Sequence, residues 1–105
     1  MHQAIMDASV ATDKAAYANG QEVHISVTVE DGVGPVEGAD VRIVLTVPNG
    51  AALGGSSTTT AQGVATISHT VDAGLEGAGV CVVETMASKH RYETVTAEAI
   101  FKVYG

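Results

Sequence analysis

The chain has 105 residues, the length of one domain with a modest hydrophobic core. Its 12 acidic residues outnumber its five lysines and arginines, and the net charge of −7 argues against binding nucleic acid or an anionic membrane, since both require basic side chains. The single cysteine, Cys81, excludes an intrachain disulfide, and no apolar stretch approaches the ~20 residues of a membrane-spanning helix, so we expect no direct membrane insertion.

Short runs of β-forming residues alternate with turn-forming residues along the whole chain. Residues 6–12 are expected to form a first strand at a sheet edge, and residues 13–20 a connection. The clearest strand covers residues 22–30, where every second residue is apolar: Val23, Ile25, Val27 and Val29. This alternation predicts one packed face and one solvated face.

The middle of the chain predicts one further long strand and one short one. Residues 31–35 interrupt the pattern, and Pro35 lacks the N–H that a sheet interior requires. Residues 40–47 form the next strand, with these side chains inward: Val41, Ile43, Leu45 and Val47. The small and polar residues 51–60 predict a mobile tract with a short edge strand near residues 57–60.

The last third predicts strands at residues 64–71, 80–87 and 92–104, with a loop at 72–79 and a basic turn at 89–91. The inward side chains of these strands are Ala65, Ile67, His69, Val71, Cys81, Val83, Thr85, Val95, Ala97, Ala99, Phe101 and Val103. About seven short strands, joined by turns every ten residues or so, are typical of an antiparallel β-sandwich.

Several turn and packing motifs occur in a fixed order: Tyr17-x-x-Gly20-x-x-Val23, Gly34-Pro35-Val36-x-Gly38-Ala39-x-Val41, Val47-Pro48-Asn49-Gly50, Thr60-x-x-Gly63-Val64-Ala65-Thr66 and Tyr92-x-x-Val95-x-Ala97-x-Ala99-x-Phe101-x-Val103. Over roughly residues 8–103 they resemble the bacterial Ig-like domains of the invasin and intimin type, related to fibronectin type III. The resemblance implies an all-β, Ig-like antiparallel β-sandwich of about seven strands with Greek-key connections. It also implies spacing, display or adhesion in prokaryotic cell-surface or secreted proteins, and no shared catalytic residues.

Candidate residues for chemistry are few. His69 lies on an apolar strand face, where a partly buried, hydrogen-bonded histidine is expected rather than a base or ligand. The cysteine and histidines lack the spacing of a zinc site. Acidic residues gather on two loops and leave a calcium site open as the alternative to solvated charges: Glu30, Asp31, Glu37 and Asp40 on one, Asp72 and Glu76 on the other. We therefore expect no catalytic, cofactor-binding or metal-binding residues.

One surface feature stands apart from the inward pattern. The alternation of three strands directs Val44, Val80, Val82 and Ile100 outward, and in an Ig-type topology these strands share one sheet. Scattered exposed valines are ordinary, but a contiguous apolar patch is typical of a protein-contact surface. We therefore predict a protein-contact patch at these residues.

These observations predict that residues 1–105 form a single Ig-like domain of a larger, extracellular or cell-surface protein, with its termini at opposite ends. Its expected partners are neighbouring domains of the same polypeptide or another surface protein, and the isolated domain is expected to be monomeric. The alternative is a carbohydrate- or receptor-binding accessory module of a secreted enzyme such as a protease. Sugar binding favours exposed aromatic platforms, and the chain has few aromatic residues: Tyr17, Tyr92, Phe101 and Tyr104.

Overall fold

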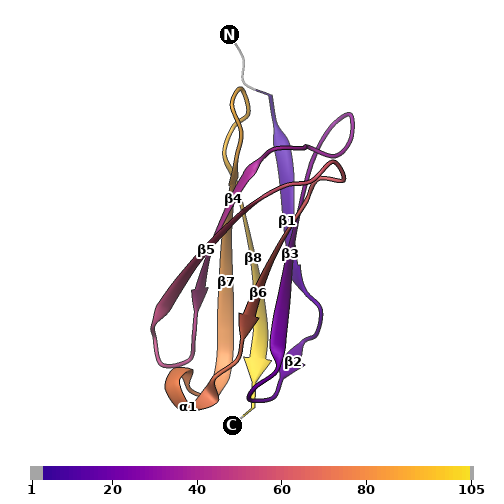
Figure 1. Ribbon diagram of the computed structural model, residues 1–105. Coiled ribbons are helices and arrows are strands. Elements are labelled where there is room, and N and C mark those ends of the chain that lie inside the picture. The colour runs from indigo at the N-terminus through magenta and orange to yellow at the C-terminus, as the bar shows by residue number, and fades with distance from the viewer. Residues whose placement is uncertain (1–3, 105) are drawn as a thin grey trace.

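The computed structural model describes residues 4–104 as two β-sheets packed face to face (Figure 1). The three-stranded sheet has the order β1 (Met6–Thr12), β3 (Glu22–Asp31), β6 (Val64–Thr70). The five-stranded sheet has the order β2 (Ala16–Tyr17), β8 (Val95–Val103), β7 (Gly79–Ser88), β4 (Asp40–Thr46), β5 (Ala52–Thr58). The strand pairs are antiparallel except for β2 with β8. The predicted all-β, Ig-like sandwich is confirmed.

The core lies between the two sheets and follows the alternation of the sequence. The inward residues of β3 are fully buried, as predicted: Val23, Ile25, Val27 and Val29. From the five-stranded sheet, β4 and β7 contribute Val41, Ile43, Leu45 and Val83. A strand with one dry and one wet face can bury only every second residue, so the period-two pattern fixes which face of each strand forms the core.

The expectation of a short strand near residues 57–60 is wrong. β5 spans seven residues, begins earlier, and pairs with β4 over its whole length. The glycines of β5 favour a loop in the sequence. In the structure, Gly55 marks a place where the sheets approach closely, since an added Cβ atom would lie 3.4 Å from the side chains of both Ile43 and Ile67.

Two short elements occupy predicted connections. The strand β2 lies in residues 13–20, where Tyr17 is buried with its ring edge-on to Phe101 at 5.3 Å between centroids. The single helical turn α1 (Ala73–Glu76) lies in the predicted loop at 72–79. It is capped by Asp72, whose Oδ1 accepts hydrogen bonds from two backbone N–H groups of the turn. The last strand is also shorter than predicted and starts at Val95 rather than at residue 92.

The molecule is elongated, with extents of 50 × 22 × 16 Å. At one end of the long axis, Ala4 pairs with the loop between β7 and β8 through a hydrogen bond of 2.9 Å to the Arg91 carbonyl. At the other end, the N–H of Tyr104 donates to the carbonyl of Tyr17. The first and last described residues therefore lie at opposite ends, as Figure 1 shows. No helix within residues 4–104 has the length and apolar character needed to cross a membrane.

Two buried threonines in this core give a matched test of hydrogen-bond satisfaction. Among the described residues, the Thr85 hydroxyl is buried without a hydrogen-bond partner. The Thr59 hydroxyl accepts from the Ala39 N–H at 2.8 Å and donates to the Val36 carbonyl at 2.6 Å. We predict that Thr85→Val raises the free energy of unfolding by about 1 kcal/mol, because it replaces an unpaired polar group with an isosteric methyl.

Thr59→Val is the control, and we expect it to lower the free energy of unfolding by about 1–3 kcal/mol because it leaves two buried backbone groups unpaired. Urea unfolding of both variants at pH 7 measures the difference. Equal destabilisation by the two substitutions would contradict the assignment of Thr85 as an unsatisfied hydroxyl.

Candidate protein-contact surface

The outer face of the five-stranded sheet carries the residues predicted to form a contact patch. Val44 is 44%, Val80 49% and Ile100 63% exposed, whereas Val82 is half-buried. All of them point away from the three-stranded sheet, because their neighbours along each strand are buried in the core.

The register of the sheet brings most of these residues together. Val82 lies directly opposite Ile100 on the neighbouring strand. Val44 lies in the next row, directly opposite Glu84, and is only diagonal to Val82, whose own partner on β4 is Thr46. Val80 lies further along β7, opposite Lys102, at the margin of the patch. Of the four residues, the register therefore places Val82 and Ile100 directly side by side, with Val44 diagonal to that pair and Val80 further along β7.

Sequence reasoning missed other members of this surface. Met86 continues the outward series of β7 and is 49% exposed. Glu84 and Glu98 lie directly opposite each other in the row that also contains Val44. The alternation that selected Val80 and Val82 would have identified Glu84 and Met86, but the opposition of the glutamates depends on the register between strands.

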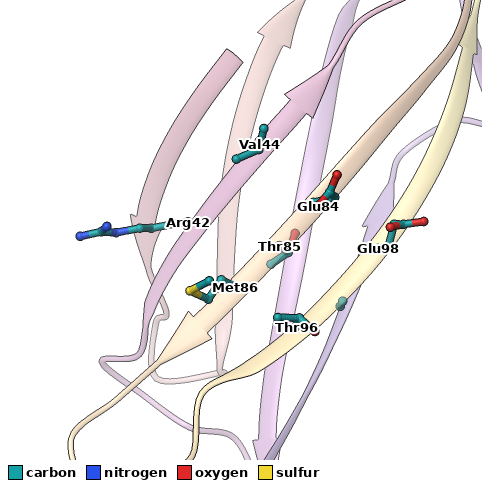
Figure 2. A pocket seen from close by; sticks show the side chains of 8 residues that line it. Arg42, Val44, Glu84, Thr85, Met86, Thr96 and Glu98 are labelled. Carbon is teal, nitrogen blue, oxygen red and sulfur yellow. The ribbon is translucent and has the colours of Figure 1, made fainter. Parts of the chain in front are cut away.

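An open depression of about 610 Å³ adjoins the patch; its lining includes Arg42, Val44, Glu84, Met86, Thr96 and Glu98 (Figure 2). Within the described residues, neither glutamate forms an ion pair. Like charges placed directly opposite each other repel. The surface therefore combines exposed apolar side chains with two glutamates that form no ion pair within residues 4–104.

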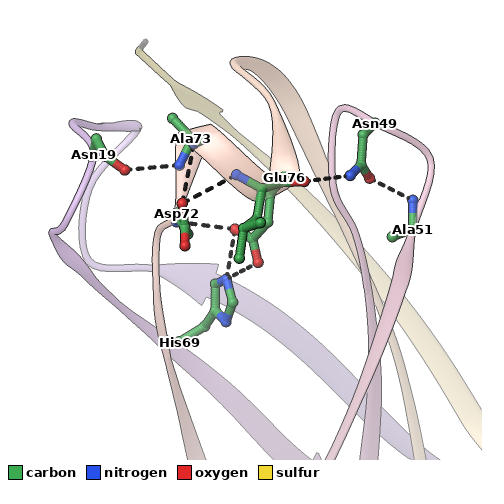
Figure 3. A network of polar contacts seen from close by, with 9 residues as sticks. Asn19, Asn49, Ala51, His69, Asp72, Ala73 and Glu76 are labelled. Atoms are coloured by element: carbon green, nitrogen blue, oxygen red, sulfur yellow. Dashed lines mark hydrogen bonds and ion pairs between the residues drawn. The ribbon is translucent and has the colours of Figure 1, made fainter.

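His69 has the structural role that the sequence predicts. Its Nε2 lies 3.1 Å from Oε1 and 3.0 Å from Oε2 of Glu76, and both side chains are largely buried. Oε1 of Glu76 also accepts a hydrogen bond from the Asp72 N–H at 3.2 Å (Figure 3). The depression beside Val44 is lined by neither His69 nor His24.

The same network joins three loops at one end of the sandwich (Figure 3). The Asn19 side chain accepts from the Ala73 N–H at 2.8 Å, and the Asn49 side chain donates to the Leu75 carbonyl at 2.6 Å. Because both asparagines bond to the backbone of the α1 turn, they hold it against the loops that precede β3 and β5. The His69–Glu76 pair is thus part of a hydrogen-bond network that connects these loops.

One residue of the acidic loop considered for calcium, Asp31, uses its carboxylate within the fold. Oδ1 of Asp31 accepts from the N–H groups of Val33 at 2.8 Å and Gly34 at 3.0 Å, and Oδ2 accepts from the Tyr92 hydroxyl at 2.8 Å. These bonds, led by that from Tyr92, lower the pKa of Asp31 below its ordinary value of 3.8. Across residues 4–104 no three potential metal-ligating side chains of histidine, cysteine, aspartate or glutamate gather into a site.

Cys81 is buried on the inner face of β7. Burial, and secondarily the charge of Glu76, raise the pKa of its thiol. A thiol kept protonated and away from solvent is a poor nucleophile, so Cys81 is a packing residue.

No protein-family model and no curated protein sequence matches this chain. Solved structures do resemble it in fold. One is described as a tetra-tandem repeat in the extending region of a large adhesion protein. It is 21% identical to this chain with a TM-score of 0.75, and the match covers 94% of this chain and 24% of the adhesion-protein chain. A DUF4785 family protein from Legionella pneumophila is 20% identical with a TM-score of 0.66, covering 89% of this chain and 26% of its own.

The CARDB domain of a Pyrococcus furiosus protein, solved in complex with di-metal ions, is 10% identical with a TM-score of 0.61, covering 97% of this chain and 90% of that domain. At these identities the likeness establishes a shared β-sandwich fold. The chain spans about a quarter of the length of the first two structures.

The Asp31–Tyr92 hydrogen bond gives a pH-dependent prediction. Because the folded pKa of Asp31 is depressed, the stability it contributes is fully present above pH 3.8 and is lost as pH falls through the folded pKa. Tyr92→Phe removes the largest cause of that shift. We expect the variant to have a lower free energy of unfolding than the parent near neutral pH. The difference between the two proteins should become smaller below pH 3.8.

Urea unfolding of both proteins between neutral pH and pH 3 measures this difference. Tyr104→Phe serves as the control because Tyr104 is exposed, and its effect should stay small at every pH. If the stability difference between Tyr92→Phe and the parent does not change with pH, Tyr92 does not stabilise the fold through the carboxylate of Asp31.

Proposed function

We propose that this chain is a non-catalytic Ig-like module of a prokaryotic cell-surface or secreted protein, which spaces neighbouring domains and contacts protein through one sheet face. The observation that carries the proposal is the placement of the first and last described residues at opposite ends of a 50 Å axis. When the polypeptide enters a domain at one end and leaves it at the other, the domain adds its full length to the chain of domains. Its fold is shared with the repeat of an adhesion protein's extending region, which supports this role.

The contact role rests on the outer face of the five-stranded sheet. Val44 and Ile100 are exposed on that side, Val82 is half-buried beside Ile100, and Val80 extends the apolar surface toward one end. Contiguous exposed apolar surface is typical of sites that dock another protein. The partner in this proposal is a neighbouring domain of the same polypeptide or another surface protein.

The carbohydrate-binding alternative lacks an observation in its favour. Tyr17 and Phe101 are buried in the core, and the Tyr92 hydroxyl is bonded to Asp31. Of the aromatic residues in the described chain, Tyr104 is the one that is largely exposed. A single exposed ring does not form the flat aromatic surface on which sugars stack.

The spacing role is tested by joining one, two and three copies of the chain directly in tandem. Small-angle X-ray scattering should show the maximum dimension growing with each copy by a length close to the 50 Å axis. The same copies joined through long glycine-serine linkers are the control and should show a broad distribution of distances. Growth much smaller than the domain length would indicate side-by-side packing and contradict the spacing role.

The contact face is tested with a photo-crosslinking residue introduced in the intact surface protein. At position 100 we expect adducts with a neighbouring domain or a second surface protein. At position 24, where the exposed His24 lies on the outer face of the other sheet, we expect few. Equal labelling at both positions would contradict a specific contact through the five-stranded sheet.

The patch should also be dispensable for folding. We predict that replacing Val44 and Ile100 together with threonine changes the free energy of unfolding by no more than about 0.5 kcal/mol per site, because both side chains are exposed and threonine retains β-branching. Val83→Thr is the control on the inner face and should cost about 1–3 kcal/mol, because it buries an unpaired hydroxyl. A large loss of stability in the outer-face variant, measured by urea unfolding, would assign those residues to folding.

A further inference from the structure

We propose that the open edge of β5 binds an extended strand of another polypeptide, which adds a sixth strand to the five-stranded sheet. β5 is the terminal strand of that sheet and has β4 as its hydrogen-bonded neighbour. Its edge is separate from the outer-face patch, so the inference concerns a second surface.

The register shows which backbone groups face outward. The Ala51 carbonyl accepts from the Val47 N–H at 3.0 Å, and the Thr59 N–H donates to the Ala39 carbonyl at 3.0 Å. In an antiparallel pair, successive residues direct both backbone groups alternately toward and away from the neighbour. The odd-numbered residues of β5 therefore bond to β4. The even-numbered residues direct their N–H and C=O groups to the open side: Ala52, Gly54, Ser56 and Thr58.

This edge lacks the features by which proteins usually block strand addition. Residues 51–60 contain no charged side chain and no proline. Gly54 has no side chain, and no atom lies within 4 Å of where its Cβ would be. At the opposite edge of the same sheet, β2 pairs with the end of β8 through Ala16 and Tyr17. Within residues 51–60, therefore, neither a charged side chain nor a proline opposes strand addition.

The side chains beside the edge indicate what kind of strand would bind. Leu53 and Ile67 are only partly buried where β5 approaches β6. Gly55 lies between them at a close approach of the two sheets, where an added Cβ atom would lie 3.4 Å from the side chain of Ile67. A bound strand with an apolar residue at every second position would place those residues over Leu53 and Ile67. β4 is such a strand, and it already pairs with the other edge of β5.

The probe is therefore a synthetic peptide with the sequence of residues 39–47, used at millimolar concentration with the folded chain. Amide hydrogen exchange by NMR should slow about tenfold or more at Ala52, Gly54, Ser56 and Thr58, because each N–H gains a strand partner. The odd-numbered amides of β5 should be unaffected. A peptide of the same composition, shuffled so that its apolar residues no longer alternate, is the control.

Two variants at one outward position separate backbone pairing from side-chain contact. Ser56→Pro removes an outward N–H without removing a bond to β4, and should abolish the protection. Ser56→Ala keeps the N–H and should retain it. If Ser56→Pro does not fold, the exchange pattern of the parent protein and of Ser56→Ala decides the question.

Several results would overturn the proposal. The first is unchanged exchange at the even-numbered residues with the alternating peptide. The second is equal protection by the shuffled peptide. Protection confined to β6 would place the binding edge on the other sheet. Dimerisation of the chain alone in sedimentation velocity, abolished by Ser56→Pro, would assign the edge to a second copy.

Discussion

The packing of β3 against β4 and β7 is the constraint on which the other features depend. β3 buries Val23, Ile25, Val27 and Val29 completely, and each strand opposite it buries alternate residues to match. The side-chain period of a strand is two residues, so a slip of one residue would expose this whole set to water. A slip of one residue in β7 would likewise place Glu84 in the core. Core burial thus fixes the register, and the register fixes the surface.

How much could be predicted from the sequence depends on whether a feature is encoded within one strand or between strands. The alternation in β3, β4, β7 and β8 is local, and it correctly predicted the inward faces of β3, β4 and β7 and the outward direction of Val44 and Ile100. The opposition of Glu84 and Glu98 depends on pairing between β7 and β8, which no local pattern specifies. The outward direction of these side chains was therefore predictable, and the pairing of the two glutamates was not.

The errors have separate physical causes. β5 was placed too late because glycine has low intrinsic strand propensity, whereas Gly55 is favoured here by the close approach of Ile43 and Ile67. β2 is only two residues long and depends on pairing with β8 and on the burial of Tyr17. α1 is a single turn held by its Asp72 cap and by the network around His69. In each case tertiary contacts outweigh local propensity.

The two outer faces of the sandwich differ in chemistry, and this difference bears on function. The outward residues of β3 are polar or charged: His24, Ser26, Thr28 and Glu30. The outward residues of the five-stranded sheet include Val44, Val80, Val82 and Ile100. Stability does not require this asymmetry, because exposed apolar residues add little to a core that is already closed. A domain that acted only as a spacer would tolerate polar residues on both faces. Under the proposed contact role, another polypeptide would cover the apolar residues on that face and leave the polar face in water.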